Sequence, residues 1–107
     1  MSEILRRVQT LVLDGDFRVS EHGFDELEED AILASDVIAG IAAAIEIEDY
    51  PDRNRGMSVL VLQHDAGAAI HVVWAIPAGE RRPAVLVTAY RPDPRRWSGD
   101  FRRRKRQ

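Results

Sequence analysis

The fold is decided by residues 70–90, whose sequence is IHVVWAIPAGERRPAVLVTAY. Residues 70–76 and 83–90 are rich in the β-branched and aromatic side chains that favour strands. Residues 77–82, PAGERR, have the proline, glycine and charge that are typical of a connecting loop. The pattern therefore predicts two neighbouring antiparallel strands of one sheet.

The pairing of these two strands predicts which side chains meet. A loop that pairs Ile76 with Pro83 places His71 opposite Thr88. Because side chains alternate between the faces of a strand, each face then has its own set. One face takes His71, Val73, Leu86, Thr88 and Tyr90, and the other takes Ile70, Val72, Trp74, Val85, Val87 and Ala89. We expect helices on the second, apolar face and a functional site or solvent on the first.

The rest of the chain is organised around this pair. Apolar spacing and turn residues predict an amphipathic helix over residues 3–13, followed by an extended link over residues 17–20. Two further helices are expected, a short one capped by Ser20 and one over residues 36–45 capped by Ser35 and Asp36. An edge strand over residues 45–50 and a central strand over residues 57–63 follow. Helices precede strands. We therefore expect an α+β fold, with N-terminal helices packed on one face of a three- to four-stranded antiparallel sheet.

Length and composition narrow the class of protein. A chain of 107 residues supplies one core, and we assign residues 1–97 to a single domain and residues 98–107 to a basic C-terminal tail. The absence of cysteine excludes disulfides, thiolate–zinc sites and cysteine nucleophiles. The N-terminus does not have the pattern of a secretory signal, and no apolar stretch is long enough to cross a bilayer. We expect a cytoplasmic protein without membrane contact.

The net charge of −3 hides an asymmetry along the chain. Residues 1–80 carry 5 Arg and Lys against 16 Asp and Glu, a net −11, whereas residues 81–107 carry 10 against 2, a net +8. The basic end can bind RNA phosphates, meet an acidic partner, neutralise the acidic body within the fold, or serve as a mobile solubilising tail. The predicted nucleic-acid-binding residues are Arg95, Arg96, Arg102, Arg103, Arg104, Lys105 and Arg106.

A series of short motifs spanning residues 17–97 resembles a known family. The motifs are Ser20 with His22 at a helix start, Ser35-Asp36-Val37, Glu48-Asp49-Tyr50-Pro51, Ile70-His71-Val72-Val73, and Val87-Thr88-Ala89-Tyr90 followed by Arg91-Pro92-Asp93-Pro94 and Trp97. In this order they resemble the domain-of-unknown-function family 4258. The resemblance implies a fold similar to the RelE and MqsR ribonuclease toxins, with RNA as substrate and an antitoxin partner of the zinc-finger or DNA-binding type.

The chain departs from the family pattern after His22. Glu26 and Asp30 stand where the family has arginines. Arginines there would stabilise the charge that develops on a phosphorane, and carboxylates cannot. The departure favours a catalytically inactive relative.

The residues of a metal-independent endoribonuclease are nevertheless present. RNA cleavage needs a base for the 2′-hydroxyl, an acid for the leaving 5′-oxygen and a cation for the developing charge. The candidate catalytic residues are His22, His71, Thr88, Tyr90 and Arg91. The alternative for each histidine is structural: His71 as a half-buried strand residue and His22 as a helix-start residue.

Neither a cofactor nor a metal is predicted. His22, His64 and His71 have no HxH or HxxxH spacing, so they do not form a recognisable metal site. Two functions remain: a toxin-like endoribonuclease, or a catalytically inactive protein- or RNA-binding module of the same fold.

Overall fold

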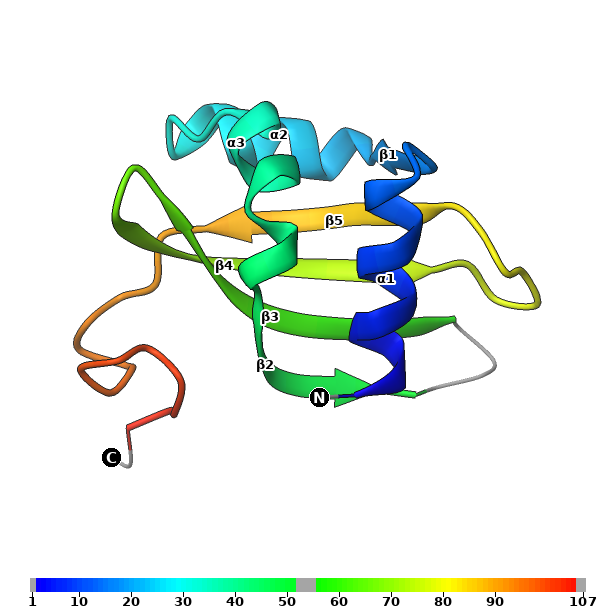
Figure 1. Cartoon of the computed structure of the whole chain (residues 1–107). Helices are drawn as coiled ribbons and strands as arrows, with labels where there is room; N and C mark the ends of the chain where they lie inside the picture. The colour runs from blue at the N-terminus through cyan, green and yellow to red at the C-terminus, as the bar shows by residue number, and fades with distance from the viewer. Residues whose placement is uncertain (1, 52–55, 106–107) are drawn as a thin grey trace.

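Five strands form one mixed sheet in the computed structural model, which describes residues 2–51 and 56–105. The strand order is β1-β5-β4-β3-β2 (Figure 1). The strands are β1 Phe17–Val19, β2 Ile45–Tyr50, β3 Met57–Asp65, β4 Ala68–Ile76 and β5 Ala84–Tyr90. β1 pairs parallel with β5, and the other neighbours pair antiparallel.

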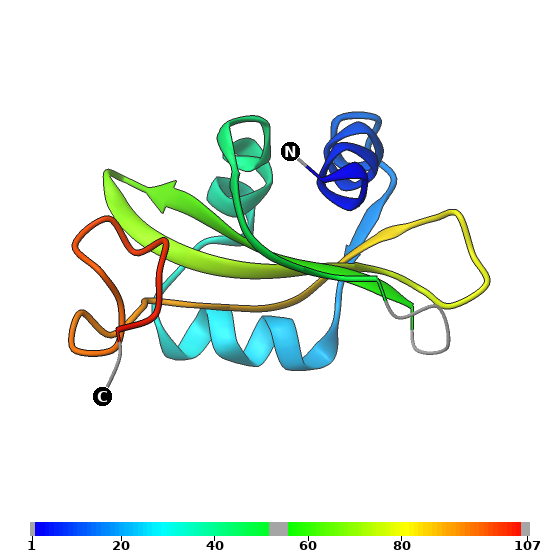
Figure 2. The ribbon, with the colours of Figure 1, turned by 90° about the horizontal axis from the view of Figure 1, so that it is seen from below.

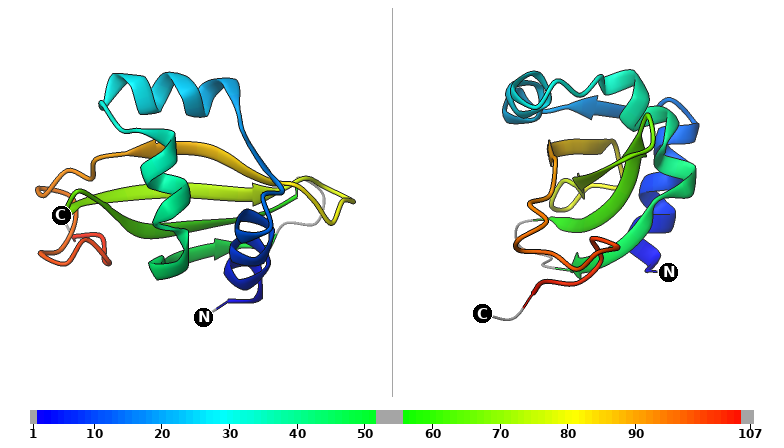
Figure 3. Two further views of the ribbon diagram at one scale, coloured as in Figure 1. Left: turned by 45° about the horizontal axis from the view of Figure 1, so that its top comes forward. Right: turned by 90° about the vertical axis from the view of Figure 1, so that its left-hand side faces the viewer.

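The helices lie on different sides of this sheet. They are α1 Glu3–Leu13, α2 Glu21–Glu29, α3 Ala34–Ala39 and a 3-10 turn, η1 Ile41–Ala43. α1 and α3 lie side by side over one face, whereas α2 lies on the other side, along β5 (Figures 2 and 3). Buried side chains of α1, α3 and η1 form the main core with the apolar residues of β3, β4 and β5. None of the helices in the described ranges has the length and apolar character needed to span a bilayer.

The structure confirms the α+β class and corrects its details. The sheet has five strands, is mixed and carries α2 away from α1 and α3, so the expected three- to four-stranded antiparallel sheet with all helices on one face is wrong. Residues 17–19 form β1 because they pair with Ala84–Leu86, 67 residues further along the chain. Three residues are too few to show a strand period, so the sequence predicted only an extended link there.

The helix predicted over residues 36–45 is shorter and begins earlier. α3 starts at Ala34 after Leu33, which makes no side-chain cap bond, so Ser35 and Asp36 lie inside the helix and do not cap it. The α-helix ends at Ala39, with Gly40 as its C-cap. A Cβ at Gly40 would lie 3.2 Å from Gln63 Nε2, so this glycine lies in close contact with β3.

A β-bulge sets the pairing of β4 with β5. His71 lies opposite Tyr90 and Val73 opposite Thr88, but beyond the bulge Trp74 lies opposite Leu86. The predicted pairing of His71 with Thr88 is therefore wrong by two residues. The extra residue turns Leu86 to the core face. Paired residues share a face, so His71, Thr88 and Tyr90 still lie together on the face opposite the core.

Ser20 attaches α2 to β5. Its hydroxyl oxygen accepts from the Gly23 N–H at 2.9 Å, as the predicted N-cap, and its O–H donates to the Val87 carbonyl at 3.0 Å. β1 pairs with only the first three residues of β5, so α2 covers the part of the β5 edge that β1 leaves open. The helix approaches closely: a Cβ at Gly23 would lie 2.7 Å from the Leu86 carbonyl oxygen.

We predict that Gly23→Ala destabilises the protein by about 1–3 kcal/mol, the usual range for overpacking. At an open helix position the same change would stabilise by about 1 kcal/mol. Gly99→Ala is the control, because a Cβ at Gly99 meets nothing within 4 Å. Urea unfolding measures both variants. A Gly23→Ala protein at least as stable as the wild type would contradict the close approach of α2 to β5.

Candidate functional site

His71 is the centre of the sheet face opposite the core. Its side chain is fully buried on β4, and Tyr90 lies opposite on β5. The His71 Nδ1 atom is 3.3 Å from the Tyr90 hydroxyl oxygen. The indole ring of Trp97, itself buried, stands edge-on to the imidazole with ring centroids 4.4 Å apart. The imidazole is thus enclosed by the sheet and by the segment that follows β5.

The hydrogen bonds of His71 determine where its proton resides. Nε2 lies 2.8 Å from the carbonyl oxygen of Phe101. A carbonyl only accepts, so Nε2 carries the proton and Nδ1 of the neutral ring accepts from the Tyr90 hydroxyl. Burial lowers the pKa of His71; the bond to Phe101 opposes this shift, and the positive charge of Arg104 adds to it. His71 is therefore neutral at pH 7, with both nitrogens occupied.

Tyr90 connects this buried ring to the surface. Burial raises the pKa of Tyr90; the nearby positive charge of Arg104 opposes the shift, and the negative charge of Glu48 adds to it. The phenol therefore stays protonated at neutral pH and donates to His71. Its partly exposed side chain also borders a pocket, so Tyr90 can contact a ligand that His71 cannot reach.

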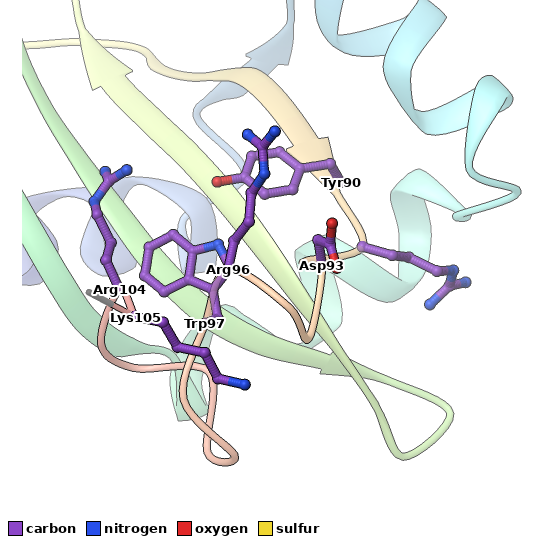
Figure 4. Close-up of a pocket in the computed structure, with 7 residues that line it drawn as sticks. Tyr90, Asp93, Arg96, Trp97, Arg104 and Lys105 are labelled. Carbon is purple, nitrogen blue, oxygen red and sulfur yellow. The ribbon is translucent and has the colours of Figure 1, made fainter. Parts of the chain in front are cut away.

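The pocket beside Tyr90 is strongly basic. Its volume is about 630 Å³, and Figure 4 shows the side chains that surround it. The lining residues are Tyr90, Arg91, Asp93, Arg96, Trp97, Arg104 and Lys105. Four cations thus surround one carboxylate. That carboxylate, Asp93, already accepts from the Arg95 backbone N–H at 2.8 Å and from its guanidinium at 3.3 Å.

The four cations differ in how far they are neutralised. Arg104 lies over the Trp97 ring, 5.0 Å from its centroid, and forms a two-point ion pair with Glu48 at 3.1 and 3.4 Å. Glu48 also accepts from the Tyr50 hydroxyl. Within residues 2–51 and 56–105, no carboxylate lies within ion-pairing distance of Arg96 or Lys105. These two cations are therefore available to an anionic ligand.

The structure separates the predicted catalytic residues. Thr88 lies two residue pairs along the sheet from the His71–Tyr90 pair, on the same face. His22 lies at the exposed start of α2, where its Nε2 is 3.5 Å from Glu26 Oε1. This helix start contacts β5 at Leu86 and Val87, about 10 Å along the strand from Tyr90. His22 is therefore not part of the His71 cluster.

Arg91 is held by hydrogen bonds to the ends of β3 and α2. Its Nη2 donates to Asp65 at 3.0 Å, its Nε to the Asp30 carbonyl at 3.3 Å, and its backbone N–H to the Asp30 carboxylate at 2.9 Å. Asp30 and Glu26 stand where the family resemblance leads us to expect arginines. The Asp30 carboxylate binds the Arg91 backbone N–H and Glu26 lies beside the His22 ring, and neither residue lines the pocket.

The predicted nucleic-acid-binding residues also divide. Arg96, Arg104 and Lys105 line the pocket, whereas Arg95 pairs with Asp93 outside it and Arg102 borders a separate hollow. Arg103 is exposed, and Arg106 falls outside the described residues. No group of three or more potential metal ligands occurs among the residues that the structure describes.

The sequence did not indicate roles for Trp97, Phe101 or Glu48. Residues 98–105, expected to be a tail unless something holds them, lie against the sheet through Phe101 and Arg104. One sequence signal was available: Trp97 and Phe101 are large apolar residues within a stretch of charges, and such residues gain from being covered.

We predict that the free energy of unfolding decreases as the pH falls from about 6.5, the ordinary histidine value, toward 5. The folded-state pKa of His71 is lowered, so the unfolded chain binds the extra proton first and folding loses stability. Urea unfolding at pH 7.5 and 5.5 should show a larger loss for wild type than for His71→Gln. The carboxylates titrate alike in both proteins, so equal losses would contradict the neutral buried imidazole.

Comparison with known proteins places most of the chain in a family. Residues 19–91 match the family described as "Domain of unknown function (DUF4258)", a range that includes His71 and Tyr90 and ends before Trp97. No curated protein and no solved structure matches the chain. The match covers more than half of the 107 residues and confirms the family resemblance seen in the sequence. The chain therefore belongs to the DUF4258 family.

Proposed function

We propose that this protein binds single-stranded RNA in the pocket bordered by Tyr90, Arg96, Trp97, Arg104 and Lys105. The observation that carries the proposal is a pair of cations, Arg96 and Lys105, that have no carboxylate partner among the described residues and lie beside two aromatic side chains. Backbone phosphates bind such cations, and single strands add contacts between bases and aromatic rings. A volume of about 630 Å³ suits a small segment of a strand and not a duplex.

The charge distribution favours this end of the molecule for a polyanion. Residues 1–80 carry a net −11, so they repel RNA from most of the body. Arg91 and Arg104 already have carboxylate partners in Asp65 and Glu48. Affinity should therefore depend mainly on Arg96 and Lys105.

We predict that Arg96→Ala weakens binding to a fluorescent oligouridylate several-fold, with Arg81→Ala as the matched control. Arg81 is an exposed arginine in the β4–β5 loop, at the opposite end of the sheet. Losing one phosphate contact should also reduce the slope of log affinity against log salt by about 0.7. Fluorescence anisotropy across a salt series measures both quantities. Equal affinities and slopes for the two variants would exclude the pocket as the RNA site.

A second candidate function is metal-independent endoribonuclease activity. It is favoured by the His71–Tyr90 pair, whose phenol opens onto the basic pocket. Tyr90 can accept the 2′-hydroxyl proton while passing its own proton to Nδ1 of His71, so the two residues act together as the base. Burial opposes the imidazolium that results, which limits the rate. This candidate includes the RelE- and MqsR-like fold and the antitoxin partner that the family resemblance implies.

We predict that any cleavage of single-stranded RNA leaves a 2′,3′-cyclic phosphate and falls about 10²-fold in both Tyr90→Phe and His71→Gln. Tyr90→Phe keeps the ring and removes only the hydroxyl, so RNA binding should survive. Product analysis by gel electrophoresis and mass spectrometry measures the loss. Cleavage that persists in Tyr90→Phe would remove Tyr90 from the mechanism. If the wild-type protein binds RNA and does not cleave it, a catalytically inactive RNA-binding module is the remaining function.

A further inference from the structure

We propose that residues 97–105 form a strap that opens and exposes His71 to a ligand held beside Tyr90 and Arg96, which line the adjacent pocket from outside the strap. Arg104 and Lys105 belong to the strap and move with it while they bind the same ligand. The inference rests on the proposed function, because RNA is the ligand and its phosphates compete for the strap. In the closed position the strap seals His71 beneath Trp97 and Phe101. His71 is then buried when the strap is closed, and it is available for its candidate catalytic role when the strap is open.

Few contacts hold the strap to the sheet. Apart from its bonds to two side chains of the sheet, the hydrogen bonds that the structure describes for it stay within residues 93–105, the segment that follows β5. The Ser98 N–H donates to the Arg103 carbonyl and the Lys105 N–H to the Arg96 carbonyl, both at 2.8 Å. Among the described residues, two side chains of the sheet bond it: His71, through the Phe101 carbonyl, and Glu48, through Arg104. Such a segment can separate from the sheet as a unit without disturbing the strand pairing.

The closed position is also locally unfavourable. Phe101 has φ of 60°, in the left-handed region that bulky residues rarely adopt. Besides the basic pocket, a second hollow of about 440 Å³, lined in part by His64, Ala69 and Phe101, lies along the strap. Trp97 is buried, but Phe101 is only partly so, and residues 102–105 are exposed. Opening therefore gives up the burial of Trp97 and the partial burial of Phe101, and it breaks the bond from the Phe101 carbonyl to His71 that helps to hold the strained φ.

Arg104 couples the strap to the pocket. In the closed position its guanidinium is bound to Glu48, although the side chain lines the pocket. A phosphate that binds the same guanidinium must displace Glu48, so a polyanion binds better to the open form. A ligand shifts a conformational equilibrium only through such a difference in affinity. RNA binding therefore favours release of the strap, and release frees His71 Nε2 from the Phe101 carbonyl.

The test compares two carboxylate-to-amide variants of the full chain. Glu48→Gln removes the ion pair that holds the strap, and Asp16→Asn removes the exposed Asp16–Arg82 pair, which lies away from the strap. NMR follows solvent exchange of the His71 Nε2–H and the pKa of the ring. We expect the His71 Nε2–H to exchange two- to five-fold faster in Glu48→Gln, which is the range for loss of an exposed ion pair. The pKa of His71 should move toward the ordinary histidine value. Asp16→Asn should change neither quantity.

Acrylamide quenching of tryptophan fluorescence gives an independent readout. Trp74 is fully buried in the core, so an increase in quenching reports Trp97 and the strap. We expect increased quenching in Glu48→Gln, and in wild type on addition of oligouridylate.

Two results would overturn the inference. The first is that His71 Nε2–H exchange and tryptophan quenching in Glu48→Gln equal those in wild type and Asp16→Asn. The strap would then be a fixed part of the fold. The other is bound oligouridylate, verified by anisotropy, that leaves His71 exchange and quenching unchanged. Neither result affects the RNA-binding proposal. Loss of RNA binding alone would defeat that proposal, while the Glu48→Gln comparison would still decide whether the strap opens.

Discussion

The hydrogen-bonding requirement of one buried imidazole organises the functional end of this protein. A polar group without contact to water needs partners for its donor and its acceptor. His71 has them in the Phe101 carbonyl and the Tyr90 hydroxyl, contributed by two different parts of the chain. This requirement draws the segment after β5 back over the sheet. The same segment brings Arg96, Arg104 and Lys105 to the pocket, so the segment that gives the buried His71 its hydrogen-bond partner also builds the basic surface.

The charge asymmetry of the chain is partly resolved within the fold. Three arginines of the basic end pair with carboxylates of the acidic body: Arg82 with Asp16, Arg91 with Asp65, and Arg104 with Glu48. The sequence left open whether the basic end would neutralise the body or bind a partner. The structure allows both, because the pairing is incomplete among the described residues and two of the cations without a carboxylate partner, Arg96 and Lys105, line one pocket. An exposed ion pair adds little stability, so an arginine that also lines the pocket can change partner at low energetic cost.

Local sequence signals predicted those parts of the structure that depend on local interactions. The period of α1, the cap at Ser20 and the strands around the loop at residues 77–82 follow from side-chain preference and spacing alone. β1 escaped prediction because its three residues become a strand only by pairing with β5. The β-bulge escaped for a similar reason, since an extra residue in one strand changes neither composition nor alternation enough to be recognised.

The sequence by itself determined the α+β class, the helices α1 and α2, the strands β2 to β5, the family, and the placement of His71, Thr88 and Tyr90 on one sheet face. These features depend on periods and motifs a few residues long. Only the tertiary structure decided that His71 is enclosed by Trp97 and Phe101, that His22 lies apart, and that the cations separate into paired and free. These features depend on contacts between residues 19 to 56 positions apart, and no local pattern encodes such distances.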